Sequence, residues 1–432
     1  MKQKFSDVSA FRHDPLGLFA RKGFGSTEPL VKLNLGFSPV YLVTDPLLAR
    51  TVLKTDEAKI DKGVLVRKLR KVIGTSSITM SGSEHQKRRA IIHQHLARGI
   101  MNDYIPQIAG LIRRHAVMLV REREFSAHEV MAPLALRIIA SLLFGRDVLS
   151  SGDEVALMEA VYVAEKHMAD SLFRIFPRSP MRAFRDHLEL RHSRQIMAAV
   201  VDRVRSRATS TSLLRSLETL NLTAAELSDE ILLLLLAGHH TTGNAATWVL
   251  YFLATERGLS EKISKEAQSL VTESGEVDPL RLPRAETSLR LAREALRLYP
   301  PFYWFSREVK KTVELGGRKL SKGTSLIISP WQIQRDPRNW DEPNLFKSDR
   351  TYNSPAFLPF GLGPRACVGI GLGLLELQLL ALEMASACEV DILSEVPAAE
   401  PTPAVTLLPP KIRLRLRPKA PSRVILSQET AA

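Results

Sequence analysis

The chain has 432 residues, and its 60 Lys and Arg against 46 Asp and Glu give a formal net charge of +14 at pH 7. Two cysteines exclude a disulfide framework and favour a reducing compartment, while 45% apolar residues suffice for a large core. Because the basic residues are spread along the chain rather than gathered in one arm, the charge argues against a nucleic-acid-binding protein.

The first residues, MKQKFSDVSAFRHDPLGLF, contain neither the apolar stretch of a signal peptide nor a membrane span. The longest strongly apolar run, residues 231–238, is too short to cross a bilayer. We therefore expect a cytoplasmic protein without a transmembrane anchor. No linker-like or repeated segment divides the chain, so residues 1–432 are expected to form a single domain.

Two short β-rich segments open the chain, and residues 30–37 and 39–44 are expected to pair as a hairpin. From residue 45 to residue 300 the apolar periodicity and the supply of Leu, Ala, Arg and Glu predict helices. Prolines are expected to divide this region into separate helices. These prolines are 133, 177 and 180, the last two within the turn FPRSP.

After residue 300 the pattern changes to strands. Residues 312–320 and 323–331 alternate around glycine-containing turns, and Arg or Lys alternates with Ile or Leu in the tail segment 409–423. The tail therefore predicts a half-exposed strand. The fold class predicted for the whole chain is mainly α with a smaller β region.

One helical segment, residues 228–248, combines a long apolar run with small and polar residues. Ser228 gives a capping pattern at its start. The small pair Ala237 and Gly238 would let a large group approach the backbone. Two threonines follow, and a Thr hydroxyl can donate to a carbonyl one turn back and open a polar groove. In an apolar pocket such a groove is suited to hydrogen-bonding water and dioxygen.

A second helical segment, EALRLYPP, places Glu294 and Arg297 at i and i+3 on one face, and the helix must stop at Pro300. Taken alone, this pair is indistinguishable from an ordinary surface ion pair of little energetic value.

The segment FGLGPRACVG presents Cys367 in a glycine-rich loop, immediately before the apolar segment 370–385. A cysteine at the start of a helix meets unpaired N–H groups and the positive end of the helix dipole, which favour thiolate. Arg365 adds a cation. A thiolate held in this way is the proximal ligand of a haem that activates oxygen. Cys388 has no such loop and is expected to be structural.

The chain is identified as a member of the cytochrome P450 family. The resemblance covers about residues 12–418 and leaves 419–432 as a flexible tail. It implies the helical, triangular P450 fold with its small β region, and haem b (iron protoporphyrin IX) bound through Cys367. The residues that match the haem-ligand signature are Phe360, Gly363, Arg365, Cys367 and Gly369.

The sequence AGHHTT resembles the family pattern Ala-Gly-x-acid-Thr-Thr, with His240 in place of the acid. Thr241 falls where the family stabilises dioxygen and guides protons to it. His240 can take and release protons near neutral pH, so proton transfer survives in principle. The alternative is that His239 and His240 only fill space beside the helix, which is our expectation for His239.

The resemblance also assigns Glu294, Arg297 and Arg350 to the family's Glu-x-x-Arg element and its later arginine. Ser348 stands where that later arginine is usually preceded by proline. These three residues are expected to hold the fold rather than to act in catalysis.

Besides Arg365, the resemblance nominates His85, Arg89 and Arg307 to bind the two haem propionates, and a guanidinium suits a carboxylate. His85 and Arg89 are spaced i and i+4 on one helix face. Their neighbours Lys87 and Arg88 are assigned to a surface that docks an electron carrier, with a solvated helix face as the alternative.

The distal pocket is expected to be apolar. Aromatic residues at 302–305 border substrate in the family, although clustered aromatics more often pack in a core. Apolar walls imply a hydrophobic small molecule as substrate. The pocket candidates are Ala237, Phe302, Tyr303, Trp304, Leu407 and Leu408.

The implied activity is insertion of one oxygen atom from dioxygen into a hydrophobic small molecule that is terpenoid, fatty-acid or polyketide-like. Electrons would come from NAD(P)H through a separate ferredoxin or flavodoxin and its reductase, steered by the basic surface. Two alternatives stay open. One is a peroxygenase or isomerase that needs no reductant, and the other is a haem-binding or nucleic-acid-binding protein without turnover.

Overall fold

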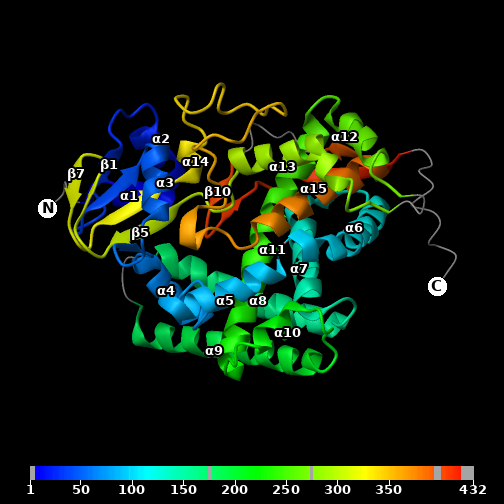
Figure 1. The fold of residues 1–432 in the computed structure, drawn as a ribbon, viewed down its shortest axis with the longest axis horizontal. Helices are drawn as coiled ribbons and strands as arrows, with labels where there is room; N and C mark the ends of the chain where they lie inside the picture. The colour runs from blue at the N-terminus through cyan, green and yellow to red at the C-terminus, as the bar shows by residue number, and fades with distance from the viewer. Residues whose placement is uncertain (1–4, 97, 174–177, 273–275, 394–399, 420–432) are drawn as a thin grey trace.

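The computed structural model describes residues 5–419 except 97, 174–177, 273–275 and 394–399. Helices dominate these ranges and the strands are short, which confirms the predicted class (Figure 1). The helices are α1 (Val8–His13), α2 (Pro15–Gly23), α3 (Pro46–Lys54), α4 (Val64–Ile73), α5 (Gly82–His95), α6 (Arg98–Arg121), α7 (Ala127–Phe144), α8 (Ser151–Phe173), α9 (Pro180–Arg205), α10 (Leu213–Glu218), α11 (Ala224–Thr255), α12 (Leu259–Gln268), α13 (Glu286–Leu298), α14 (Pro330–Ile333) and α15 (Ile370–Ala387).

The main sheet has the strand order β1-β2-β8-β5-β3, in which β2 and β8 are parallel and the other neighbours antiparallel. A second sheet has the order β4-β12-β9, and two-stranded pairs join β6 to β7 and β10 to β11. The strands are β1 (Leu30–Leu33), β2 (Val40–Val43), β3 (Ile60–Asp61), β4 (Phe125–Ser126), β5 (Phe305–Val309), β6 (Val313–Leu315), β7 (Arg318–Leu320), β8 (Ser325–Ile328), β9 (Cys388–Ile392), β10 (Thr402–Pro403), β11 (Leu407–Leu408) and β12 (Arg413–Pro418).

The strand predictions are confirmed where the structure describes them. β1 and β2 form the expected hairpin, with Leu30 opposite Val43. In β12, Leu414 and Leu416 are buried while the arginines between them are exposed, as the alternation predicted. The end of the predicted tail segment, residues 420–423, lies outside the described residues.

The central helix α11 has 32 residues, which gives it a length of about 48 Å. It begins one turn earlier than Ser228, the predicted cap. Thr223 is the N-cap: its Oγ1 accepts from Glu226 N, and Glu226 Oε2 accepts from Thr223 N, both at 3.2 Å. Ser228 instead lies buried inside the helix.

Glycines in α11 let it approach α7 closely. A Cβ added to Gly238 would lie 2.9 Å from Ile139 Cγ1, and one added to Gly243 would lie 2.8 Å from Ala132 Cα. The sequence predicted that the small pair Ala237 and Gly238 lets a large group approach the backbone. The group that occupies this space is the side chain of Ile139, so Gly238 serves helix packing.

The prolines divide the helical region only in part. Pro180 is the first residue of α9, as expected. Pro133 was expected to separate two helices, but it lies inside α7. α7 is buried along most of its length against its neighbours, and this tertiary packing outweighs the hydrogen bond that the proline removes. Pro177 lies outside the described residues.

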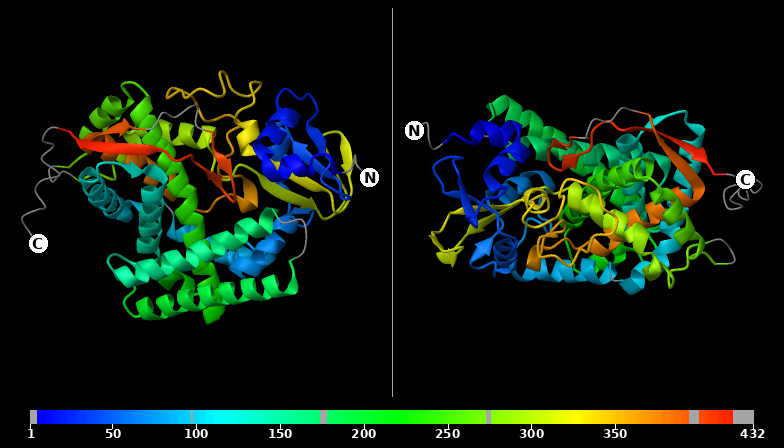
Figure 2. Two further views of the ribbon diagram at one scale, coloured as in Figure 1. Left: turned by 180° about the vertical axis from the view of Figure 1, so that it is seen from behind. Right: turned by 90° about the horizontal axis from the view of Figure 1, so that it is seen from above.

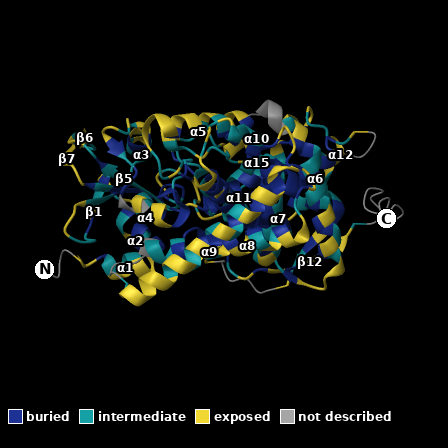
Figure 3. Cartoon of the chain, turned by 90° about the horizontal axis from the view of Figure 1, so that it is seen from below, coloured by how far each residue is buried: buried dark blue, intermediate teal, exposed yellow. Residues whose placement is uncertain are grey.

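The helices α8 and α9 pack on each other and lie across one end of α11 (Figure 2). α11 runs through the interior while α9 presents an exposed outer face (Figure 3). Within the described ranges α7 and α15 are long and apolar enough to cross a membrane by length and composition alone. Each is 67% buried inside the protein, as core helices are.

Candidate active site

The loop before α15 holds Cys367 in a fixed position. Cys367 N donates to Phe360 O at 2.8 Å. Gly361 and Gly363 have φ of +65° and +75°, a conformation that side chains disfavour. A Cβ on Gly363 would lie 2.4 Å from Leu53 O, so this position must be glycine. The thiol of Cys367 is exposed at the mouth of α15, whereas Cys388 is buried.

The charge environment of this sulfur differs from the prediction. The surrounding chain raises the pKa of the Cys367 thiol by desolvation, while the Gly369 N–H and the charge of Arg89 lower it by less. The cation that acts on the sulfur is therefore Arg89 of α5. Arg365, which the sequence placed in this role, pairs with Glu57 instead. A metal ion at the sulfur deprotonates a thiol outright.

Arg365 lies in the short 3-10 turn Gly363–Arg365 and reaches away from the sulfur. Its Nη2 donates to Glu57 Oε2 at 2.8 Å and to Ser81 Oγ at 3.1 Å. Its Nη1 is buried and has no hydrogen-bond partner among the described residues. A buried guanidinium nitrogen without a partner is costly unless a ligand accepts from it.

Other cations crowd around Arg365. Burial and the charge of Arg365 lower the pKa of Arg307 to about 10, that of Lys62 to about 8 and that of His85 to about 4. The charge of Arg89 also acts on His85. These groups come from β5, the β3–α4 connection, α5 and the cysteine loop. The fold thus gathers cations that repel one another and a neutral imidazole, and the carboxylates of Asp61 and Glu57 oppose the repulsion in part.

This cluster fits the two carboxylates of a haem. Negative charge would relieve the mutual repulsion of the cations and give Arg365 Nη1 its acceptor. The structure thus brings together all four predicted propionate residues and adds Lys62, which the sequence analysis missed. Lys62 Nζ donates to Ile78 O at 2.7 Å and to Met80 O. No motif marks this lysine, because only the tertiary fold brings it to the cluster.

A groove of about 860 Å³ adjoins the cation cluster. Its lining includes His85, Arg89 and His93 of α5 together with Glu57 and Pro364. The groove is therefore bordered by α5 and by the cysteine loop.

The docking role predicted for Arg88 is wrong. Its side chain is 2% exposed, and it pairs with Glu226 at 2.6 Å and with Glu230 at 3.3 Å. The buried residues of α5 recur three or four positions apart, and Arg88 is one of them, on the face turned to α11. Lys87 is exposed and pairs with Glu84 at 2.8 Å, so it is still available to a partner.

One face of α11 is open at the predicted oxygen side. Ala237 is exposed, although its neighbours toward the N-terminus are buried. Thr241 is half-buried, and its Oγ1 donates to the Ala237 carbonyl one turn back, as predicted. Ala237 and Thr241 thus expose a small apolar side chain and a hydroxyl on the same helix face.

His240 does not share that face. Its Nε2 forms an ion pair with Glu165 Oε2 of α8, while its Nδ1 is buried without a hydrogen-bond partner within the described part of the chain. His239 is buried against it, with ring centroids 4.1 Å apart, and burial lowers the pKa of His239 to about 3. The His239 ring therefore stays neutral near pH 7, which agrees with the expectation that His239 has a structural role. Glu165 carried no signal in the sequence.

The aromatic candidates separate into two groups. Tyr303 was a pocket candidate, but it is fully buried and donates to Ala404 O at 3.0 Å, so it belongs to the core together with Leu407. Phe302 is exposed, and Trp304 and Leu408 are half-buried. These three stay predictions for the pocket wall.

A clamp missed by the sequence analysis joins α11 to the turn before β11. Asn244 Nδ2 donates to Thr406 Oγ1 at 3.0 Å and to Leu407 O at 3.1 Å. Asn244 follows Thr241 by three residues, so one helix turn carries both the hydroxyl and the anchor of the final turn. In the sequence, a polar Asn on the apolar face of a helix was the feature that could have indicated this contact.

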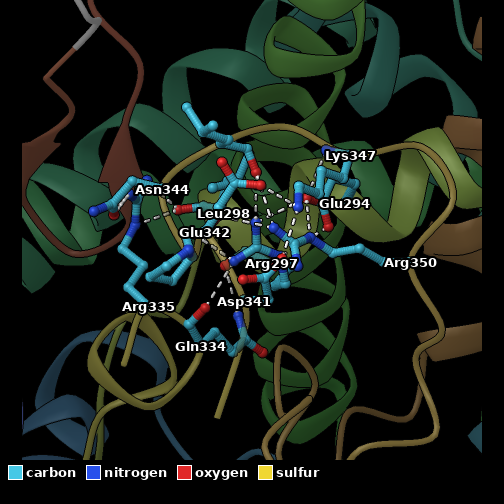
Figure 4. A network of polar contacts seen from close by, with 12 residues as sticks. Glu294, Arg297, Leu298, Gln334, Arg335, Asp341, Glu342, Asn344, Lys347 and Arg350 are labelled. Atoms are coloured by element: carbon cyan, nitrogen blue, oxygen red, sulfur yellow. Dashed lines mark hydrogen bonds and ion pairs between the residues drawn. The ribbon is translucent and has the colours of Figure 1, made fainter. Parts of the chain in front are cut away.

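Glu294, Arg297 and Arg350 meet as predicted (Figure 4). Arg297 is fully buried, and its Nε and Nη2 donate to the two Glu294 oxygens at 2.8 and 2.7 Å. Arg350 Nε donates to Glu294 Oε1 at 3.0 Å. Arg297 Nη1 also donates to the carbonyls of Gln334 and Pro343 at 2.8 and 2.7 Å. The network ties α13 to the segment after α14.

Comparison with known proteins gives consistent matches. The family model for cytochrome P450 matches residues 8–416. Cyclooctatin synthase of Streptomyces melanosporofaciens is 27% identical, over 81% of this chain and 80% of that protein. Pentalenene oxygenase of Streptomyces avermitilis is 24% identical, over 91% of each. Cyclooctat-9-en-7-ol 5-monooxygenase of Streptomyces melanosporofaciens is 27% identical, over 83% of this chain and 81% of that protein.

Proposed function

The chain belongs to the cytochrome P450 family of haem b monooxygenases, and we propose that it holds the haem iron through Cys367. The observation that carries this assignment is an exposed thiol in a loop that two glycines and a backbone hydrogen bond keep rigid. Phe360, which accepts that hydrogen bond, and Gly369, which caps α15, complete the loop. The buried Cys388 offers no such access.

The cation cluster would hold the two propionates. Arg365 offers its unpartnered Nη1, and Arg307, His85 and Arg89 surround the same region with positive charge or donors. Lys62 adds a further ammonium group. These groups would hold the haem by its carboxylates next to the cysteine loop.

The bound haem supplies the activation of dioxygen, with thiolate electron density favouring cleavage of the O–O bond. The residues of this chain would position the substrate and supply protons to the reaction. Thr241 presents a hydroxyl on the open face of α11; because its proton is donated to Ala237 O, the oxygen can accept a hydrogen bond there and take part in proton transfer. His240, the next residue, would take part in the same proton transfer.

The proposed substrate is a hydrophobic small molecule of terpenoid type. Two observations support this class. The candidate wall residues Ala237, Phe302, Trp304 and Leu408 are apolar or aromatic, and the relatives are named for oxygenation of pentalenene and cyclooctat-9-en-7-ol. Polar groups at such a wall would be few and would serve to orient the molecule.

The proposed electron source is NAD(P)H through a separate ferredoxin or flavodoxin and its reductase. The net charge of +14 would attract an acidic carrier. The groove beside α5, with exposed Lys87 on the same helix, is the proposed approach to the cysteine side of the haem. A cytoplasmic location is part of this proposal.

The carbon monoxide complex of the reduced protein tests the iron ligand. The wild type should give a strongly red-shifted Soret band, and Cys367→Ser should abolish it. Cys388→Ser is the matched control and should keep the band. A thiolate-type band in Cys367→Ser would overturn the assignment.

A second measurement tests the reaction class. Product from substrate, NADPH and an added ferredoxin system, without peroxide, supports the monooxygenase. Product formed only when peroxide is supplied would favour the peroxygenase instead.

A further inference from the structure

A carboxylate from a distant part of the chain holds the arginine of the cysteine loop. Glu57 lies in the turn between α3 and β3, 308 residues before Arg365. Its Oε2 accepts from Arg365 Nη2 at 2.8 Å, and its Oε1 forms an ion pair with Arg365 Nε. The Glu57 side chain is 23% exposed and that of Arg365 10%, so the contact is largely shielded from water.

We propose that Glu57 is a positioning residue for the haem, acting through Arg365. It holds one edge of the guanidinium and leaves the N–H groups of Nη1 for a haem propionate. This inference rests on the proposed function, and it gives a carboxylate a binding role within a cluster of cations.

The contacts of Arg365 divide its donors into two sets. A guanidinium has five N–H groups, of which three lie on Nε and Nη2. Glu57 contacts both of these nitrogens, and Ser81 Oγ accepts from Nη2 at 3.1 Å. Nη1 is buried and has no hydrogen-bond partner among the described residues. The two-point contact fixes the guanidinium plane, so Arg365 loses its conformational freedom before a carboxylate binds.

Backbone packing brings Glu57 to this arginine. Asp56 Oδ1 accepts from Ala58 N at 2.8 Å and closes the turn around Glu57. At the end of α3, Leu53 approaches the cysteine loop so closely that a Cβ on Gly363 would lie 2.4 Å from its carbonyl oxygen. The turn and the cysteine loop are therefore held against each other, and the side chain of Glu57 needs to bridge only a short gap.

The charge of Glu57 also acts on the other cations. Burial lowers the pKa of Lys62, Arg89 and Arg307, and the charge of Glu57 opposes this shift at each of them. A carboxylate beside a propionate site has two opposite effects: its charge repels the propionate, while its contact orients the arginine that binds the propionate. Because Glu57 contacts two nitrogens of Arg365 and leaves Nη1 unused, we expect orientation to outweigh repulsion.

Glu57→Gln in the haem-loaded protein tests the proposal, because it keeps the side-chain size and removes the charge. Asp56→Asn is the matched control. It removes an exposed carboxylate from the same turn, and asparagine can still accept from Ala58 N. Transfer of haem to excess apomyoglobin measures the rate of haem loss. This rate should rise about three- to tenfold in Glu57→Gln and stay within about twofold of the wild type in Asp56→Asn.

A second readout reports on the propionate itself and does not depend on turnover. The propionate bending band in the resonance Raman spectrum responds to the hydrogen bonds that the propionate accepts. The band should shift in Glu57→Gln, because Arg365 is no longer held in one orientation. It should keep its wild-type position in Asp56→Asn.

Slower haem loss in Glu57→Gln would show that repulsion is the main effect of Glu57 and would overturn the proposal. Haem loss equal to that of Asp56→Asn, or faster loss with an unchanged propionate band, would overturn it as well. Failure of the proposed function is distinguishable, because it would appear in the wild type as bound haem without a thiolate-type spectrum. The comparison of the two variants would then still decide the role of Glu57. A wild type that binds no haem would overturn both.

Discussion

Arg88 of α5 and Glu230 of α11 form an ion pair that is closed to solvent. Arg88 Nη1 lies 3.3 Å from Glu230 Oε2, and the two side chains are 2% and 0% exposed. Ser77 N also donates to this carboxylate, at 2.8 Å. The helix that carries His85 and Arg89 is thereby locked to the helix that carries Thr241, so the two sides of the haem site are held in register.

Arg88→Met should therefore destabilise the protein strongly. The substitution leaves the Glu230 carboxylate buried without its cation, which typically costs about 3–5 kcal/mol. The denaturant midpoint should fall accordingly. Lys87→Met, on the exposed face of the same helix, should change the free energy of unfolding by less than about 1 kcal/mol. Equal midpoints for the two variants would contradict the importance of the buried pair.

Arg297→Lys should prevent stable assembly of the haem site, although the charge is kept. Lysine cannot reproduce the two parallel hydrogen bonds to Glu294 together with those to the Gln334 and Pro343 carbonyls. The yield of soluble protein with bound haem is the measurement. The control is Arg290→Lys on the same helix, where the arginine makes only an exposed pair with Glu286 at 2.9 Å, which a lysine can also form. A normal haem content in Arg297→Lys would refute the prediction.

Thr241→Ala should uncouple reductant consumption from product formation. The variant loses the hydroxyl on the open face of α11, and loss of such a positioned proton donor typically costs about 10²–10⁴ in rate. Peroxide released per NADPH should rise while substrate affinity stays within about twofold. Thr255→Ala removes an equivalent i−4 hydrogen bond, to Tyr251 O, near the end of the same helix and should leave coupling unchanged. Equal coupling in both variants would remove Thr241 from the proton path.

His115 should make the protein sensitive to acid. It is buried, and burial lowers its pKa to about 4, with the charge of Arg137 contributing and a backbone interaction with Val130 opposing the shift. Because the unfolded chain binds the proton more readily, stability is full above about pH 6.5 and is lost as the pH falls toward 4. His115 alone should cost about 2 kcal/mol between pH 7 and pH 5.

His115→Phe should reduce that loss by about the same amount, as followed by denaturant unfolding at each pH. His187→Phe, an exposed position on α9, should keep the wild-type pH dependence. If His115→Phe also keeps the wild-type pH dependence, the prediction that the buried His115 ring is neutral in the folded protein is wrong.

The parts of the site that were predictable have local causes. Two glycines with positive φ and a cysteine before an apolar helix specify the loop around Cys367, because backbone conformation there depends on neighbouring residues. The i, i+3 spacing likewise determined that Glu294 and Arg297 share a helix face, and the i−4 hydrogen bond of Thr241 follows from helix geometry.

The tertiary structure decided which side chains meet across elements. The sequence placed Arg88 on the surface, whereas the packing of α5 on α11 buries it. Glu165 and Lys62 belong to segments without a recognisable motif, and only the fold brings them to the site. Tyr303 was assigned to the pocket, but the fold buries it in a cluster with Phe19, Leu42 and Leu407 and gives its hydroxyl the Ala404 carbonyl as acceptor. The sequence by itself determined the cysteine loop, the oxygen-side helix and the class of chemistry. Pairing and burial were decided by the fold, because they depend on contacts between residues that are distant along the chain.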